Sequence, residues 1–159
     1  MTDDEIVKAV RARLSDAGPI SPQPASMEQV EQAEKKIGYP LPLLLRRLYL
    51  EVANGGFGPR GRILGVVPSP QSGNSEIISD IYYGEEPNDP LHGLVQIYDW
   101  GCAICSLVDV TDPTGPMWAI DNGLFFSENM TLRDWIISYL DGTLEMPSAT
   151  DHPECEALF

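Results

Sequence analysis

Residues 41–56 read Leu-Pro-Leu-Leu-Leu-Arg-Arg-Leu-Tyr-Leu-Glu-Val-Ala-Asn-Gly-Gly, the most strongly patterned stretch of the chain. Pro42 suits the first turn of a helix, where its missing N–H would have no intrahelical partner. The Asn54-Gly55-Gly56 step ends that helix, because asparagine and glycine tolerate a left-handed backbone. Helical periodicity predicts one buried side, made of Leu44, Leu45, Leu48, Tyr49 and Val52.

Two amphipathic helices are predicted before this stretch. Thr2 caps a helix over residues 3–16, and Gly18 ends it. Residues 18–25 form a stiff, proline-rich linker. Ser26 caps the next helix, which stops at Gly38. We expect its buried stripe to be Met27, Val30, Ala33 and Ile37.

Strand-forming segments follow the Asn-Gly-Gly step. Apolar and β-branched runs predict strands at 63–67, 94–100, 102–108, 117–120 and 124–126. The piece from Glu76 to Tyr83 is compatible with a helical turn or a strand. Thr131 caps a last helix that Gly142 ends, and residues 143–159 form a polar, acidic tail. Helices, then strands, then a helix predict an α+β fold with a largely antiparallel sheet.

Charge is distributed unevenly along the 159 residues, which carry a formal net charge of −14. Residues 1–62 hold nine bases and eight acids, whereas residues 63–159 hold 16 acids and one base, Arg133. An acidic field repels nucleic acid and anionic lipid, and it speeds encounter with basic partners. We therefore expect neither nucleic acid nor membrane as a partner. Solubility is the alternative explanation of the total charge.

The composition also indicates a cellular location. No apolar run reaches the roughly 20 residues needed to span a membrane. The acidic start Thr2-Asp3-Asp4-Glu5 is unlike a signal peptide, which begins basic and then turns apolar. We expect a cytoplasmic protein whose three cysteines are reduced.

A zinc site is one alternative that the cysteine pattern raises. Cys102 and Cys105 form a C-x-x-C, and His152 and Cys155 form an H-x-x-C, which together would supply four ligands. Positions three apart on a strand point to opposite faces, so the first pair would converge only if a tight turn formed there. Buried cysteine is also common as a small apolar residue. We therefore predict no metal and no cofactor.

Catalytic motifs are not prominent either. His92 with Asp89 and a serine would make a hydrolase site, but the chain has no G-x-S-x-G elbow. The glycines between Gly55 and Gly61 follow a helix, whereas a phosphate cradle follows a strand. We predict a protein that is not an enzyme, with no catalytic residues.

The order of these elements resembles the SUKH superfamily, named for the yeast cell-wall regulator and killer-toxin-resistance proteins and their bacterial relatives. The residues that carry the resemblance are Glu34 late in its helix, Leu41-Pro42, Leu48-Tyr49-Leu50, Asn54-Gly55-Gly56, Ile97–Asp109 broken at Gly101, and Trp135. The resemblance implies one domain over residues 1–159. Its core covers about 26–142, with helix 3–16 and tail 143–159 as extensions.

The resemblance also implies a function. Bacterial members look like immunity proteins, which bind and block toxins, and many of those toxins are nucleases with basic surfaces. We expect a non-enzymatic protein that occludes a basic, nuclease-like toxin. A scaffold or regulator of a cellular protein is the second hypothesis, and a small zinc-binding protein or hydrolase is the third. The oligomeric state does not follow from the sequence.

The expected partner-binding surface is the sheet with its acidic loops. Aromatic rings among acids suit an interface, because rings provide apolar anchors and acids steer a basic partner. Strand alternation places Ile97 and Asp99 on one face of the sheet and Tyr98 and Trp100 on the other, with the buried face undecided. The predicted partner-binding residues are Glu85, Glu86, Asp89, Tyr98, Asp99, Trp100, Asp109 and Asp112.

Overall fold

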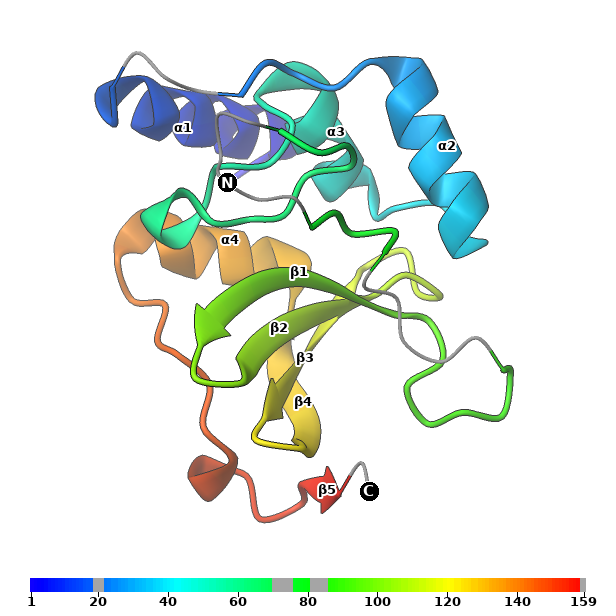
Figure 1. Ribbon diagram of the computed structural model, residues 1–159. Coiled ribbons are helices and arrows are strands. Elements are labelled where there is room, and N and C mark those ends of the chain that lie inside the picture. The colour runs from blue at the N-terminus through cyan, green and yellow to red at the C-terminus, as the bar shows by residue number, and fades with distance from the viewer. Residues whose placement is uncertain (19–21, 70–75, 81–85, 158–159) are drawn as a thin grey trace.

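The computed structural model describes residues 1–18, 22–69, 76–80 and 86–157 (Figure 1). Its helices in these ranges are α1 (Asp3–Asp16), α2 (Met27–Ile37), α3 (Leu43–Glu51) and α4 (Leu132–Asp141). The strands are β1 (Leu94–Gly101), β2 (Ile104–Asp109), β3 (Pro116–Asp121), β4 (Leu124–Thr131) and β5 (Glu156–Ala157). They form one antiparallel sheet in the order β1-β2-β3-β4-β5, which confirms the α+β prediction.

The helix boundaries follow the local chemistry of the sequence. Thr2, Ser26 and Thr131 each accept a hydrogen bond from the backbone N–H three residues on, in complete capping boxes. Gly38 and Gly142 end α2 and α4 in left-handed conformations. These predicted starts and stops are confirmed.

The buried stripes agree with the prediction except at the start of α2. The apolar side of α3 is buried, as are Val30, Ala33 and Ile37 of α2. Met27, however, is 50% exposed. Its sulfur lies 3.2 Å from the Arg46 guanidinium instead of entering the core, so its place in the stripe was wrong.

Helix α4 lies between the other helices and the sheet (Figure 1), because it contacts α1 and α3 as well as β3 and β4. Trp135 and Ile136 of α4 are fully buried against Val95, Val108 and Met117 of the sheet. A second buried cluster includes Leu94, Leu107, Ile120 and Phe125, which alternate with that core set along their strands. Both faces of the sheet are therefore buried, whereas the sequence left the choice of face open.

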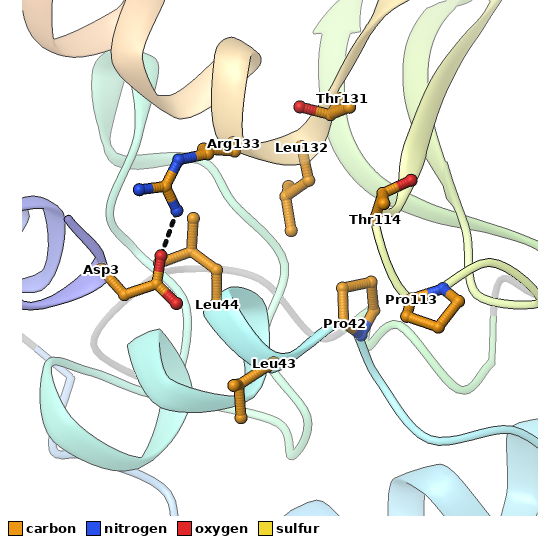
Figure 2. Close-up of a pocket in the computed structure, with 9 residues that line it drawn as sticks. All are labelled: Asp3, Pro42, Leu43, Leu44, Pro113, Thr114, Thr131, Leu132 and Arg133. Carbon is orange, nitrogen blue, oxygen red and sulfur yellow. Dashed lines mark hydrogen bonds and ion pairs between the residues drawn. The ribbon is translucent and has the colours of Figure 1, made fainter. Parts of the chain in front are cut away.

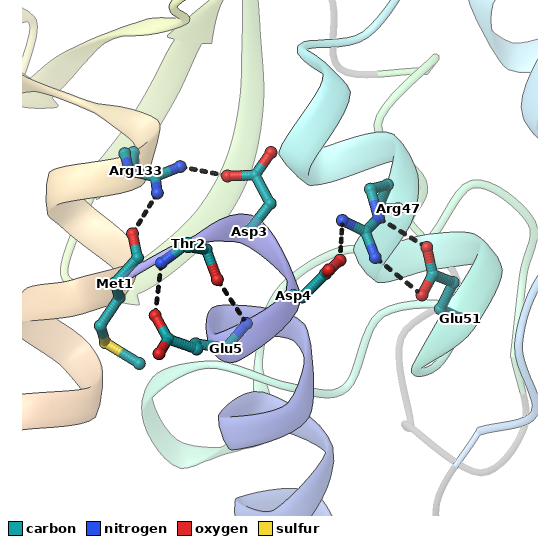
Figure 3. Close-up of polar contacts among 8 residues, drawn as sticks. All are labelled: Met1, Thr2, Asp3, Asp4, Glu5, Arg47, Glu51 and Arg133. Atoms are coloured by element: carbon teal, nitrogen blue, oxygen red, sulfur yellow. Dashed lines mark hydrogen bonds and ion pairs between the residues drawn. The ribbon is translucent and has the colours of Figure 1, made fainter.

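Ion pairs join α1 to α3 and to α4 (Figure 3). Arg133 at the start of α4 binds the Asp3 carboxylate and the Met1 carbonyl oxygen. Arg47 of α3 binds Asp4 of α1 at 2.8 Å and Glu51 of its own helix at 2.6 Å. The one base after Arg62 is thus engaged with the N-terminal helix.

Asn54 joins the end of α3 to the segment after it. Its Oδ1 accepts hydrogen bonds from the backbone N–H groups of Val66 (2.8 Å) and Val67 (3.3 Å), and its Nδ2 donates to the Val67 carbonyl (2.8 Å). Gly55 has φ of 72°, and a Cβ there would lie 2.7 Å from the Ile63 carbonyl oxygen and the Gly65 nitrogen. Only glycine fits this close approach.

The segment 63–67 was predicted as a strand, and this was wrong. It makes single bridges, from Ile63 to Tyr98 and from Gly65 to Ile77. Its backbone groups bond other partners instead. The Val66 N–H donates to Asn54, the Ile63 carbonyl accepts from the Gly56 N–H, and the Leu64 N–H donates to the Ile97 carbonyl at 2.9 Å. The bridge from Gly65 to Ile77 places part of the undecided piece 76–83 beside this segment. Residues 81–83 lie outside the described residues.

Strand β1 contains a register shift, which interrupts the alternation of its side chains. Gln96 faces Leu107 and Tyr98 faces Ser106, so Ile97 is an extra residue in a β-bulge. Ile97 and Tyr98 both enter the main core. The prediction that these two residues occupy opposite faces was therefore wrong.

Two hairpin turns differ in their residues. Asn122-Gly123 joins β3 to β4 with φ of 49° and 85°, as this turn type favours. Cys102-Ala103 joins β1 to β2 with φ of 55° and 62°, although neither residue favours that region. The predicted strand 102–108 thus begins only at Ile104.

Strand β4 is longer than predicted, and the tail after α4 contributes to the fold. Strand β4 continues past Phe126 to Thr131, with a register shift opposite Met117. After α4, Leu144 packs against the core, Pro147 is buried, and β5 pairs with β4. The described part of the tail is therefore part of the fold.

The Asn54 contacts predict a large stability loss on truncation. Asn54→Ala should lower the free energy of unfolding by about 3 kcal/mol, because it leaves buried backbone groups without partners. Urea unfolding of this variant and of the exposed control Asn88→Ala measures the difference. A loss below about 1 kcal/mol for Asn54→Ala would contradict the role given to this side chain.

The strained β1–β2 turn predicts a stability gain. The double variant Cys102→Asn, Ala103→Gly should raise the free energy of unfolding by about 1 kcal/mol, because it removes two Cβ-bearing residues that disfavour positive φ. The reverse exchange at the other turn, Asn122→Cys with Gly123→Ala, should lower it. Thermal unfolding of both variants decides the matter, and equal effects of the same sign would contradict the account.

Candidate functional site

The structure divides the predicted partner-binding residues between two ends of the sheet. Asp99 and Trp100 lie beside the β1–β2 turn, where Asp99 faces Cys105. Asp109 ends β2 at the other end, roughly 13 Å further along the strand at about 3.3 Å per residue. Figure 1 shows the turn and the loop before β1 on opposite sides of the sheet.

Four of the predicted acids lie before β1 or after β2, at the end of the sheet opposite the β1–β2 turn, and we call them the loop-end acids: Glu86, Asp89, Asp109 and Asp112. The loop before β1 lies beside the end of β2, because Val110 N–H donates to the Gly93 carbonyl at 2.9 Å. Tyr39 holds the same loop from the other side through its hydroxyl, 2.8 Å from His92 Nε2. Asp109 is half-buried and the other three are exposed, whereas Glu85 lies outside the described residues.

Four of the predicted aspartates share one local geometry. In Asp89, Asp99, Asp109 and Asp112, the Oδ1 atom accepts a hydrogen bond of 2.7–2.8 Å from the backbone N–H two residues later. This is the asparagine/aspartate turn, in which a short side chain replaces a backbone carbonyl. Each aspartate therefore shapes its turn and holds its charge in a fixed position.

Local bonding also keeps Asp112 ionised. The backbone N–H of Thr114 and then its hydroxyl donate to the carboxylate, and these bonds lower the pKa of Asp112 below its usual range. Asp109 accepts the same pair of bonds from Thr111, at 2.8 and 2.6 Å. Asp112 thus presents its charge near neutral pH, and Asp109 has the same local hydrogen-bond geometry.

A mainly apolar groove of about 240 Å³ is lined by residues of the β2–β3 loop and of the starts of three helices (Figure 2). It opens between the starts of α1, α3 and α4 and the β2–β3 loop, and its walls include Pro42, Leu44, Pro113 and Leu132. Leu43 at its rim is 63% exposed. Since Pro113 and Thr114 directly follow Asp112, the groove lies next to this one of the loop-end acids.

Tyr98 does not belong to that surface. Its side chain is 1% exposed, and its hydroxyl donates to the Pro59 carbonyl at 2.7 Å. Trp100 is half-buried, with ring centroids 4.8 Å from Tyr98 and 6.4 Å from Trp135. Tyr98 is therefore a core residue, and we leave it out of the partner surface.

The zinc candidates adopt separate local roles. Cys102 is exposed in the turn and Cys105 is buried in β2, where burial raises the pKa of its thiol to about 11 and keeps it protonated. The His152 ring stacks on Phe126 at 4.3 Å, and its Nδ1 lies 3.0 Å from Glu154. Cys155 is half-buried. Across the described ranges, no three histidine, cysteine or acidic side chains are grouped to hold a metal ion.

Glu128 is a candidate site residue that was not predicted from the sequence. Glu128 of β4 is 9% exposed and lines a second pocket, formed with α4 and the segment after it. Burial raises the pKa of Glu128 to about 7, opposed by a hydrogen bond from Ser106. The sequence did contain a signal for this burial. Glu128 lies two residues after Phe126 on the same strand, so the two side chains share a face and the acid is buried with the aromatic ring.

Comparison with known protein families assigns the chain to one of them. No helix in the described ranges combines the length and apolarity that crossing a bilayer requires. No curated protein and no solved structure gave a significant match. The family model for the SMI1 / KNR4 family (SUKH-1) matches residues 24–139, from the linker before α2 nearly to the end of α4. The chain therefore belongs to the SMI1 / KNR4 (SUKH-1) family.

Proposed function

We propose that this protein is a non-catalytic binding protein that neutralises a basic, nuclease-like toxin by occluding it. The observation that carries the proposal is the set of four carboxylates in the loops at one end of the sheet, none of which forms an ion pair with a described lysine or arginine. The one base after Arg62, Arg133, binds Asp3 instead. Carboxylates held on a surface present negative charge as phosphates do, and a basic site made for phosphate would bind them.

The groove beside the loop-end acids supplies the second part of an interface. Steering by charge raises the association rate, whereas burial of apolar anchors slows dissociation. Leu43 and the groove at Pro42 and Pro113 offer such an anchor next to Asp112. Membership of the SUKH-1 family supports a role in protein–protein interaction.

Partner capture tests the proposal in the first instance. The tagged protein, used as bait in the source cells, should retain a stoichiometric basic protein. Expression of that protein alone should stop growth, and co-expression with this chain should restore it. Retention of a cell-wall or signalling protein without toxicity would contradict neutralisation and favour the scaffold hypothesis.

Removal of charge from the loop-end acids, without loss of their turns, should slow association with the captured partner. The variant Glu86→Gln, Asp89→Asn, Asp109→Asn, Asp112→Asn keeps each turn-forming oxygen and removes four charges. We expect its association rate at low salt to fall at least tenfold, because rim charges act mainly on the encounter. Surface plasmon resonance across a salt series measures the rate.

A matched control separates position from total charge. Asp16→Asn, Glu28→Gln, Asp141→Asn, Glu156→Gln removes four exposed acids that lie away from the loop-end acids. At about 0.1 M salt, this control should change the association rate by less than about threefold and by less than the first variant does, since exposed charges then act over roughly 10 Å. Equal slowing in both variants would contradict a local surface, and unchanged binding in the first would exclude it.

A further inference from the structure

The pocket that Glu128 lines is separate from the loop-end acids. It has a volume of about 260 Å³, well above the roughly 30 Å³ share of one water molecule, and is formed by β4, α4 and the segment from Thr143 to His152. Hydroxyl-bearing side chains in its wall include Ser138 and Ser148. A pocket of this size and lining admits a polar side chain of a partner.

The Glu128 carboxylate has one hydrogen bond, from Ser106, and one oxygen without a partner among the described residues. Ser106 on β2 bonds it, and the Ser106 oxygen itself accepts a hydrogen bond of 3.0 Å from the Trp100 indole. The Glu128 Oε1 atom is buried and has no hydrogen-bond partner among the described residues. A buried carboxylate oxygen without a donor is costly, so the site is completed either by a proton or by an external donor.

The surroundings of the pocket favour a cationic donor. Glu145 and Asp151 lie in its wall and are exposed, while neither lysine nor arginine lines it. His152 bonds Glu154 through Nδ1 and stacks on the Phe126 ring. The Cys105 thiol on β2 is close enough for the Glu128 charge to raise its pKa, and it stays neutral. The negative charge of the pocket is therefore not offset from within.

We propose that this pocket binds a lysine or arginine side chain of a protein partner, with the ammonium or guanidinium group on the Glu128 carboxylate. The identification of the partner rests on the proposed function, whereas the affinity for a basic side chain does not. A hydrogen bond from an ammonium or guanidinium group to a carboxylate is about twice as strong as one between neutral groups, which suits a carboxylate in such a buried position. The cation replaces the proton that burial otherwise favours.

Small amine probes test the pocket without any partner. Nα-acetyl-lysine methylamide and Nα-acetyl-arginine methylamide keep the charged side chain. Titrated into the full chain at pH 8, they should give saturable NMR shifts at Ser138, Thr143 and Ser148. The neutral analogue acetyl-norleucine methylamide should bind at least tenfold more weakly. Glu128→Gln should weaken the binding of both basic probes at least tenfold, while Glu28→Gln, an exposed position on α2 outside the pocket, should leave their binding within twofold.

A second variant keeps the test decisive if Glu128→Gln unfolds the chain. Ser138→Leu narrows the pocket from α4 and should abolish the probe shifts while thermal unfolding stays cooperative. Equal binding of the lysine and norleucine probes, unaltered binding to Glu128→Gln, or shifts located elsewhere would each overturn the proposal. Failure here leaves the loop-end interface untouched, and failure of partner capture leaves the pocket test standing, so the two are distinguishable.

Discussion

The bonds of the Asn54 side amide are the constraint on which the rest of the structure depends. They fix the segment after α3, and Tyr49 adds a hydrogen bond of 2.7 Å from its hydroxyl to the Leu64 carbonyl. Leu64 then donates to Ile97 at the bulge of β1. Because β1 is an edge strand, this chain of bonds attaches the sheet to the helices from its side, while α4 packs over β3 and β4. The loops that carry the acids are positioned by the sheet that these contacts hold.

The acidic residues of the loops have two physical roles that a sequence cannot separate. An aspartate that closes a turn with its own Oδ1 atom also carries a charge, and asparagine would close the same turn without it. Four such turns use aspartate, at Asp89, Asp99, Asp109 and Asp112. Turn formation alone therefore does not require the charge. The choice of the acid at these positions agrees with selection for a basic partner, and it makes the Asp-to-Asn exchange the informative change.

Local signals were readable from the sequence, and contacts distant in the chain were not. The capping boxes at Thr2, Ser26 and Thr131 and the Asn122-Gly123 turn depend on residues within four positions, so these boundaries were predictable. The bulge at Ile97 depends on the partner strand, and the tight turn at Cys102 overrides residue preference. The separation of Asp99 from the loop-end acids and the burial of Tyr98 and Glu128 follow from the same tertiary contacts. The resemblance to the SUKH superfamily was found because its residues are mainly those of the local turns and stripes.

The central claim is that the loop end of the sheet, and not the helical side, meets the partner. Hydrogen–deuterium exchange of the free protein and of its complex with the captured partner measures this most directly. The account predicts slower exchange in the complex at amides of residues 86–93, 109–115 and 43–45, with the exposed side of α2 unchanged. Protection confined to α1 and α2, with the loop amides exchanging as in the free protein, would contradict it.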